Sequence, residues 1–406
     1  MTSQQMSMQA EPTHLAERAS TAEPRQKLKI VLFANTDWYL YNFRRSMAMA
    51  LVESGHDVLL LSPPGQYAEK LRALGLRWKP VPMDRRSLNP LRELILLNWL
   101  RNLLIRERVD LIHNFTIKCV IYGSLAARLS QWNNKQIKTG RINAVAGMGY
   151  VFTSTELKAW ILKPLVKALL RFALGGDDAR LILQNPDDVA LLNAALIIEP
   201  QRIRLIQGSG ADCVRFSPAT KPRNDGSFKV LLPARLLWDK GIKEYVEAAR
   251  TLREQRPEIQ FLLAGEPDKG NPASVPLETV HDWVKSGAIE WLGHVDEMPL
   301  LFRKVDTVVL PSYREGLPKG LIEAGASGIA LVTTDVPGCR EVVTDGIDGL
   351  LVPPRNSQAI ANAVLTLYND PILRNRLAAA ARAKALSHFD EKLVIKKTLD
   401  VYQELR

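Results

Sequence analysis

The stretch from Asp306 to Gly328 reads DTVVLPSYREGLPKGLIEAGASG, and its changes of pattern decide the fold. It opens with a short apolar run, Thr307 to Leu310, which has the length and composition of a buried strand. A turn-rich segment follows, and then a helix whose first position suits Pro318. Strand, loop and helix in this order predict one unit of an open α/β sheet. In such sheets ligands bind in the loops at the carboxyl ends of the strands.

Two glutamates lie on either side of this predicted helix start. Glu315 falls in the loop at the strand end, and Glu323 lies eight residues later in the second turn of the helix. The free amides of Lys319 and Gly320 lie between them, at a place that favours an anion. Two carboxylates around such amides could hold sugar hydroxyls on either side of a phosphate. The alternative is an ordinary strand, loop and helix with solvated glutamates, which the spacing alone does not exclude.

The same alternation of apolar runs and helical patterns extends along most of the chain. Strands are predicted at 28–34, 57–61, 109–113, 142–146, 179–183 and 202–206, with helices at 39–54, 65–75, 91–108, 118–131, 156–174 and 186–195. A linker rich in glycine and proline follows at 208–210 and 218–226. Strands then resume at 229–233, 259–264, 289–292, 307–310, 330–333 and 349–352, before a helical end from 357. This pattern predicts an α/β protein with two parallel, doubly wound domains.

Length and composition agree with a multidomain globular protein. A chain of 406 residues is too long for one core, and its hydrophobic and charged contents of 46% and 24% are ordinary for a globular protein. No uncharged apolar run reaches the roughly 18 residues of a membrane span. The first 26 residues are polar and lack the apolar segment of a secretory signal, so we expect a disordered tail. Three widely spaced cysteines fit a reducing cytoplasm rather than a disulfide framework or a metal site.

The excess of positive over negative charge falls entirely in the first half of the chain. Residues 1–208 carry 28 lysines and arginines against 17 acidic residues, whereas residues 209–406 carry 26 of each, so the whole net charge of +11 falls in the first half. An excess of this kind indicates an anionic partner, such as an acidic lipid surface or a phosphorylated acceptor. Nucleic acid ranks last, because no aromatic-interleaved RNA motif, zinc module or basic helix-turn-helix is visible.

Several motifs together resemble one known family. The segment EGLPKGLIE, from Glu315 to Glu323, resembles the E-x7-E signature of the retaining, nucleotide-sugar-dependent glycosyltransferases of family 4. The segments 209–218 and 234–241 resemble the hinge entry and the diphosphate-binding loop of that family. In the first half, SLNP, FTIK, YGSLAA and GMGYVF look like bacterial enzymes that add an N-acetylhexosamine to an undecaprenyl-diphosphate-linked sugar. The resemblance covers the chain from about Lys27 to its end.

The resemblance implies a GT-B fold, in which two Rossmann-like doubly wound domains face each other across a cleft. Residues 27–208 would form the acceptor-binding domain and residues 209–385 the nucleotide-sugar-binding domain, while residues 386–406 would form a helix that returns to the first domain. Residues 1–26 remain the predicted tail.

The donor-binding residues are inferred from the matching motifs of the second half. Arg235 and Lys240 would bind the donor diphosphate and stabilise the charge on the departing nucleotide, with Glu315 holding a donor-sugar hydroxyl during catalysis. Glu323 would hold the ribose, and the base would stack near residues 291–295. No Asp-x-Asp pair occurs in the sequence, so we expect no metal. The remaining donor contacts are expected from Glu266, Leu317, Pro318 and Lys319.

The first half supplies the acceptor-binding candidates, some of which have a structural alternative. The chain lacks the glycine-rich loop that most of the family has after the first strand, so Asn35 and Asp37 are expected to act through their side chains; a polar helix cap is the alternative. His113, at a strand end, is a catalytic candidate that could bind a sugar hydroxyl, although such a histidine is more often structural. The other expected acceptor contacts, from an arginine pair, a strand-end lysine and a Gly-x-Gly turn, are Arg85, Arg86, Lys118, Gly147 and Gly149. For the arginine pair, plain surface charge is the alternative and the commoner outcome.

One helix pattern indicates membrane contact. Residues 156–174 combine four basic side chains with a broad apolar face, which is typical of a helix lying in a membrane interface. A core helix with a solvated charged face is the alternative. The excess charge of the first half favours membrane contact.

These expectations combine into one function with two alternatives. The chain is expected to be a retaining, metal-independent hexosyltransferase without a cofactor, whose donor is a UDP-sugar and whose acceptor is a lipid-diphosphate-linked saccharide of bacterial surface polysaccharide or glycan biosynthesis. It would work in the cytoplasm, on the anionic inner face of the plasma membrane. A UDP-sugar 2-epimerase shares the fold but needs no acceptor, and the intact E-x7-E disfavours it. A non-catalytic partner subunit would be suggested by loss of Arg235, Lys240 or a glutamate, and none is lost.

Overall fold

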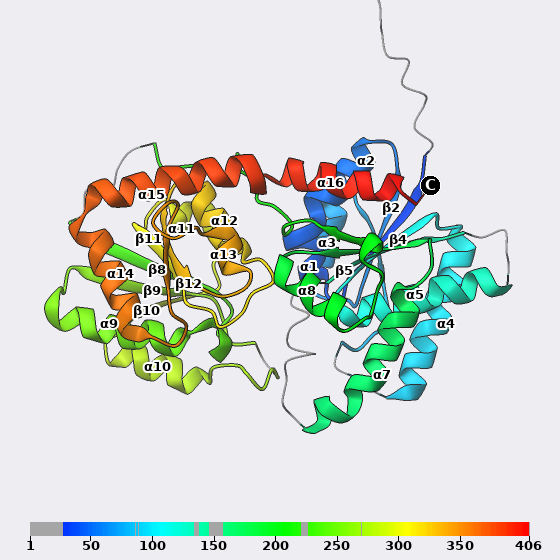
Figure 1. The fold of residues 1–406 in the computed structure, drawn as a ribbon, viewed down its shortest axis with the longest axis horizontal. Helices are drawn as coiled ribbons and strands as arrows, with labels where there is room; N and C mark the ends of the chain where they lie inside the picture. The colour runs from blue at the N-terminus through cyan, green and yellow to red at the C-terminus, as the bar shows by residue number, and fades with distance from the viewer. Residues whose placement is uncertain are drawn as a thin grey trace, which may run out of the picture.

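The structure, a computed structural model, describes residues 27–85, 87, 89–133, 138–145, 157–220, 226–268 and 270–405. These residues form two parallel sheets, each flanked by helices, that lie side by side (Figure 1). The first sheet has the order β3-β2-β1-β4-β5-β6-β7 and the second β10-β9-β8-β11-β12-β13. The predicted pair of doubly wound domains is thereby confirmed.

The bounds of the strands are as follows. In the first sheet they are β1 (Lys29–Phe33), β2 (Asp57–Ser62), β3 (Arg77–Pro80), β4 (Leu111–Phe115), β5 (Gly140–Ala144), β6 (Ala179–Leu183) and β7 (Ile203–Leu205). In the second they are β8 (Phe228–Pro233), β9 (Ile259–Ala264), β10 (Glu290–Gly293), β11 (Thr307–Leu310), β12 (Ala330–Thr334) and β13 (Leu350–Val352).

The helices of the first half include one π-helix. They are α1 (Asp37–Tyr39), the π-helix η1 (Leu40–Arg44), α2 (Arg45–Glu53), α3 (Ala68–Ala73), α4 (Pro90–Glu107), α5 (Ile117–Asn133), α7 (Leu157–Leu174), α8 (Pro186–Ala194) and the 3-10 turn η2 (Pro200–Arg202). The single helix predicted at 39–54 is therefore three consecutive segments.

The helices of the second half end with α16, which returns to the first domain. They are the 3-10 turn η3 (Trp238–Lys240), α9 (Ile242–Gln255), α10 (Leu277–Lys285), α11 (Met298–Phe302), α12 (Lys319–Ala326), α13 (Cys339–Val342), α14 (Ser357–Asn369), α15 (Pro371–Lys384), the π-helix η4 (Ala385–Phe389) and α16 (Glu391–Gln403).

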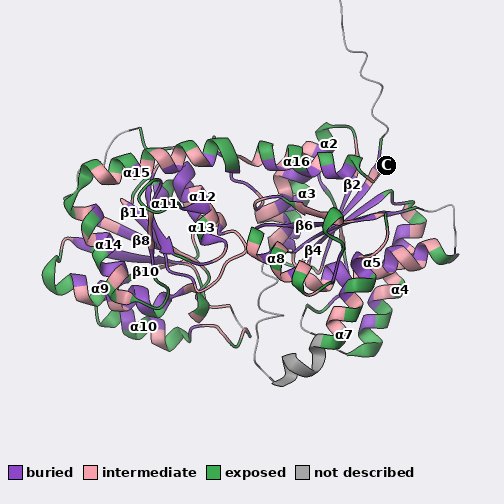
Figure 2. Cartoon of the chain, viewed as in Figure 1, coloured by how far each residue is buried: buried purple, intermediate pink, exposed green. Residues whose placement is uncertain are grey.

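Burial explains why apolar runs located most of the strands. The four residues from Ile30 to Phe33 are each fully buried, because helices cover both faces of a parallel sheet. Figure 2 shows buried residues gathered along the strands and exposed residues on the outer helix faces. The edge strand β3 was missed because only Trp78 among its residues is buried, so it contains no apolar run.

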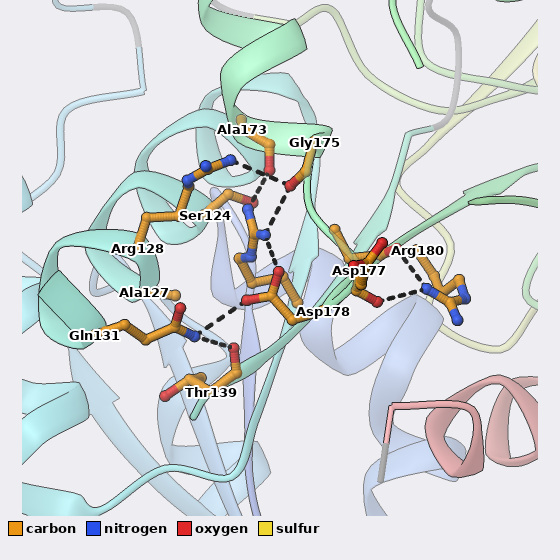
Figure 3. A network of polar contacts seen from close by, with 12 residues as sticks. Ser124, Ala127, Arg128, Gln131, Thr139, Ala173, Gly175, Asp177, Asp178 and Arg180 are labelled. Atoms are coloured by element: carbon orange, nitrogen blue, oxygen red, sulfur yellow. Dashed lines mark hydrogen bonds and ion pairs between the residues drawn. The ribbon is translucent and has the colours of Figure 1, made fainter. Parts of the chain in front are cut away.

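Strand β5 begins two residues before the predicted bound because its buried positions include polar ones. Arg141 is 1% exposed, donates hydrogen bonds of 2.7 Å to the carbonyls of Ala173 and Gly175, and pairs with Asp178. Figure 3 shows these partners together, with Gln131 donating to Asp178 from the adjacent helix. This network fixes the carboxyl end of α7 against the sheet.

The last helix crosses from the second sheet to the first. Figure 1 shows α15 and α16 following one another along one side of both sheets. Val394, Val401 and Tyr402 of α16 pack into the core of the first sheet. Backbone hydrogen bonds of 2.9 Å join Ala211 to Phe389 and to Glu391, so the two crossing segments are tied together.

Each sheet has a point where the strand order reverses. In the first sheet this point lies between β1 and β4, and in the second between β8 and β11. The loops that follow these four strands carry most of the predicted site residues, in the position where open α/β sheets bind ligands.

Candidate active site

Lys240 and Glu315 form an ion pair at the switch point of the second sheet. Lys240 ends η3 after β8, Glu315 follows β11, and their Nζ and Oε1 atoms lie 2.5 Å apart with side chains only 16% and 12% exposed. The next residue, Gly241, has a φ of 69°, and a Cβ there would lie 2.1 Å from the carbonyl oxygen of Pro311. Only glycine permits this approach, so Gly241 brings the lysine to the loop of the glutamate.

The loop of Glu315 holds its carboxylate in a defined position. The Ser312 hydroxyl donates a 2.7 Å hydrogen bond to Oε1, the same atom that faces Lys240. The backbone amide of Glu315 donates to the carbonyl of Pro337. Neither side-chain contact uses Oε2, so this oxygen is the one with which the carboxylate can meet a ligand hydroxyl.

The start of α12 lies between the two glutamates, as the sequence predicts. Pro318 is the N-cap rather than the first helical residue, so the amides of Lys319 and Gly320 are among the first four N–H groups of the helix, which have no intrahelical acceptor. Burial raises the pKa of Glu323, and Lys319, whose Nζ lies 3.5 Å away, opposes this shift. A carboxyl group in such surroundings is suited to bind neutral hydroxyls.

Arg235 lies at the rim of the same sheet edge. Its side chain is 56% exposed and its Nη1 lies 2.9 Å from Asp268, which also lies 3.4 Å from Arg85 of the first domain. Asp268 was not among the predicted site residues, and its only signal in the sequence is an acidic residue in a strand-end loop. Glu266 is exposed, and its backbone carbonyl accepts a bond from the amide of Leu236.

The indole of Trp291, at the expected base site, is held by one hydrogen bond and one ring contact. Its indole N–H donates a 2.8 Å hydrogen bond to the carbonyl of Gly265, and its ring lies against that of His281. His294, from the same segment, is 3.3 Å from Asp296. The indole is therefore oriented by the end of β9.

On the first domain, Asp37 has a structural role. Its carboxylate accepts hydrogen bonds from the amides of Trp38, Tyr67 and Ala68, at 2.7 to 3.0 Å, and the residue is 5% exposed. The N-cap of the following helix is Thr36, whose hydroxyl accepts from the amide of Tyr39, so Asp37 instead joins α1 to the start of α3. Asn35 is half-buried at the end of β1.

The side chains of Lys118 and His113 both make hydrogen bonds within the protein. Lys118 donates to the carbonyls of Asp84 and Ser87 and to the Glu93 carboxylate at 2.6 to 2.9 Å, so all three ammonium protons have acceptors. It therefore holds the backbone at Asp84 and Ser87 close to Glu93, and binding a phosphate would cost these bonds.

The His113 ring is 1% exposed and its Nδ1 lies 2.7 Å from the Tyr402 hydroxyl of α16. Burial lowers its pKa well below the ordinary value, and the charge of Arg44 adds to the effect, so the ring is neutral. Its buried Nε2 makes no hydrogen bond within the part of the chain that the structure describes. Arg86, Gly147 and Gly149 lie outside the described residues.

The described residues include neither a cluster of metal-ligating side chains nor a membrane-spanning helix. No group of three or more histidine, cysteine, aspartate or glutamate side chains is placed to hold a metal ion in this part of the chain. Among the same residues, no helix combines the length and the apolar character needed to cross a membrane.

Comparison with known proteins gives matches over both halves. A family model described as "Glycosyl transferase 4-like" matches residues 29–178, and one described as "Glycosyl transferases group 1" matches residues 215–384. The first covers the sheet from β1 to the helix α7, and the second covers the paired residues Lys240 and Glu315.

Individual relatives align over most of the chain. The N,N'-diacetylbacillosaminyl-diphospho-undecaprenol alpha-1,3-N-acetylgalactosaminyltransferase of Campylobacter jejuni is 28% identical over 389 residues, which cover 93% of this chain and 99% of the relative. The UDP-Gal:alpha-D-GlcNAc-diphosphoundecaprenol alpha-1,3-galactosyltransferase of Escherichia coli is 26% identical over 80% of this chain and 83% of its own. The crystal structure of Anabaena HepE with UDP-glucose has the same fold, with a TM-score of 0.74 at 18% identity, over 93% of this chain and 99% of that one.

Proposed function

The chain belongs to the family 4 glycosyltransferases and has their GT-B fold, and from this we propose that it moves an N-acetylhexosamine from a UDP-sugar to a lipid-diphosphate-linked saccharide. The observation that carries the proposal is the Lys240–Glu315 pair beside the start of α12. The full-length similarity to the Campylobacter jejuni enzyme, whose name gives an N-acetylgalactosaminyl transfer to a diphospho-undecaprenol acceptor, supports this choice of sugar and acceptor.

The donor side of the proposed site has groups for the ribose, the diphosphate and the sugar of a UDP-sugar. Glu323, buried and with a raised pKa, is suited to the ribose hydroxyls. The amides of Lys319 and Gly320 face the diphosphate, where a helix start favours anions. Glu315 holds a hydroxyl of the sugar through Oε2, and Arg235 turns from Asp268 to the phosphate when the donor binds.

The proposed reaction proceeds on one face of the sugar. The bond from the anomeric carbon to the β-phosphate oxygen breaks, the acceptor hydroxyl attacks from the same side, and its proton passes to the departing phosphate oxygen. Lys240 and the helix-start amides stabilise the charge that forms on the nucleotide. The anomeric configuration is thereby retained. In this scheme side-chain cations and backbone amides take the place of a divalent metal.

The membrane contact is proposed to be made by the first two turns of α4 rather than by α7. Leu91, Leu94 and Ile95 are 71%, 61% and 62% exposed on successive positions of one helix face. In the described carboxyl half of α7, by contrast, Leu170 and Leu174 are buried in a core cluster. The start of α4 lies at the sheet edge that carries the expected acceptor site, and the first half holds the excess positive charge.

The double variant Leu91→Asp/Leu94→Asp should weaken binding to anionic vesicles at least tenfold. Burial of each leucine side chain in an apolar layer contributes about 1.5–3 kcal/mol of binding free energy, and the new carboxylates are repelled by an anionic surface. Flotation with phosphatidylglycerol vesicles measures this. Ile372→Asp is the matched control, because Ile372 is 83% exposed on α15 of the second domain. Equal vesicle binding by the double variant and the wild type would contradict the α4 contact.

The proposed function is tested by a panel of donors with a short prenyl-diphosphate N-acetylhexosamine as acceptor. We expect one UDP-N-acetylhexosamine to give a product heavier by a single sugar, with an α-linkage from the α-donor and an unchanged rate in EDTA. Conversion of the UDP-sugar without acceptor would instead indicate an epimerase. UDP binding without any turnover would indicate a partner subunit, and activity that depends on added manganese would contradict the metal-free mechanism.

A further inference from the structure

The loop that carries Glu315 is held from the opposite domain on both sides of the glutamate. Arg314, the residue before it, forms an ion pair of 2.6 Å with Asp188 at the start of α8. Gly316, the residue after it, accepts a 2.8 Å hydrogen bond from the side chain of Asn185. These two contacts cross from the first domain to the second, and neither was expected from the sequence.

The two α8 residues are rigidly held in their own domain. Asn185 is the N-cap of α8: its Oδ1 accepts from the Asp188 amide at 2.8 Å, and its Nδ2 donates to the Asp188 carboxylate at 3.0 Å. Asn185 and Asp188 are 0% and 1% exposed. They therefore present a fixed carboxylate and a fixed amide to the loop. Because their rotamers are already fixed, contact with the loop costs no further side-chain entropy.

Further along the same loop, two more contacts reach the first domain and the hinge. Leu317 packs against Gly208, where an added Cβ would lie 2.7 Å from the leucine side chain. Lys319 donates a 2.5 Å hydrogen bond to the carbonyl of Asn42 in the π-helix η1. From Arg314 to Lys319, the loop therefore follows the surface of the first domain.

We infer that Asp188 and Asn185 are positioning residues for Glu315, an inference that rests on the proposed function of that glutamate. Within its own domain, Glu315 is held through its carboxylate by Lys240 and Ser312 and through its backbone amide by the Pro337 carbonyl. The side chain of Arg314 and the carbonyl of Gly316, on either side of it, are held from α8. The α8 contacts then set where this carboxylate lies relative to the first domain, so the complete site forms only when the two domains are closed on each other. Sugar transfer is thereby coupled to closure, and an open enzyme binds nucleotide without activating the donor.

A double-mutant cycle with Asp188→Ala and Arg314→Ala tests the inference. Each single variant should lower kcat by about 10- to 100-fold, because a displacement of about 1 Å at a reacting group has effects of this size. The KM for the donor should change less than about threefold, since neither Asp188 nor Arg314 is itself an expected contact of the nucleotide. The double variant should be no slower than the worse single one, because both changes remove the same interaction. Arg314→Lys should restore part of the rate.

Hydrogen exchange gives a second readout that does not depend on turnover. With UDP bound, amides of the 312–319 segment should exchange at least tenfold faster in Arg314→Ala than in the wild type, because the loop loses its hold on α8. Glu404→Gln is the matched control: it breaks the ion pairs of the C-terminal helix end to Arg180 and Arg204 of the first domain without touching the loop, and should leave kcat and exchange unchanged.

The outcomes separate the inference from the proposed function. Additive losses in the cycle, unchanged exchange of the 312–319 segment, or a fall in kcat matched by an equal fraction of unfolded protein in calorimetry would each overturn the positioning role. Asp188 is buried, so if Asp188→Ala fails to fold, the half-exposed Arg314 supplies the variant that decides. Wild-type turnover tests the proposed function independently, since the variants do not enter into it.

Discussion

Glu315→Gln is expected to lower kcat by about 100- to 1000-fold, the range seen when a single charge-stabilising group is removed from an active site. The substitution keeps the size of the side chain and one acceptor oxygen, but it removes the charge that faces Lys240 at 2.5 Å. The glutamine can no longer stabilise positive charge on the sugar ring. UDP affinity should stay the same or increase slightly, because the released ammonium group of Lys240 is then available to the diphosphate.

Single-turnover kinetics and calorimetric titration with UDP measure the two quantities separately. Glu247→Gln is the matched control, since Glu247 pairs with Lys243 on the exposed face of α9 in the same domain. That variant should behave as the wild type. A full rate of transfer in Glu315→Gln would remove Glu315 from the proposed mechanism.

Lys240→Ala should reduce both the rate and the binding of nucleotide. We expect kcat/KM to fall about 1000-fold and UDP affinity about 10- to 100-fold, because the ammonium group contacts the diphosphate in the ground state and takes on more charge as the sugar departs. The substitution also leaves Glu315, whose side chain is 12% exposed, without its ionic partner, at a cost of about 2 kcal/mol in stability.

The same assays, with urea unfolding added, measure these effects, and Lys243→Ala is the control for loss of an exposed lysine. The two site variants are expected to have different effects on kcat and on UDP binding, which a general structural defect would not produce. Glu315→Gln should affect kcat alone, whereas Lys240→Ala should affect kcat and binding together. Normal UDP affinity in Lys240→Ala would show that the diphosphate is held elsewhere.

The fold could be predicted largely because its strands are buried on both faces. The predicted bounds of β6, β9 and β11 match those of the structure, since a strand covered by helices on both sides is largely apolar. The exceptions have the same cause. β3 lies at an edge with one buried side chain, and β5 buries Arg141 against carbonyls and Asp178, so neither reads as an apolar run.

The candidate site was predictable only where its parts lie close together in the sequence. Glu315, the start of α12 and Glu323 fall within nine residues, so their arrangement follows from local structure. Polar residues at other strand ends were ambiguous, because a buried polar group needs a partner and the sequence does not say whether that partner is a ligand or the protein itself. The structure gives Asp37 three backbone amides and Lys118 three oxygens, so the partners of both side chains in this structure belong to the protein itself.

The sequence by itself determined the two-domain α/β fold, the family and the strand-end position of Glu315, because apolar periodicity and turn residues act over a few neighbouring positions. Tertiary structure alone decided that Lys240 meets Glu315, that Asp268 lies between Arg235 and Arg85, and that α8 holds the loop from the first domain. These contacts join residues 33 to 183 positions apart. Their geometry depends on how strands are ordered in each sheet and how the two sheets face each other, which no local pattern specifies.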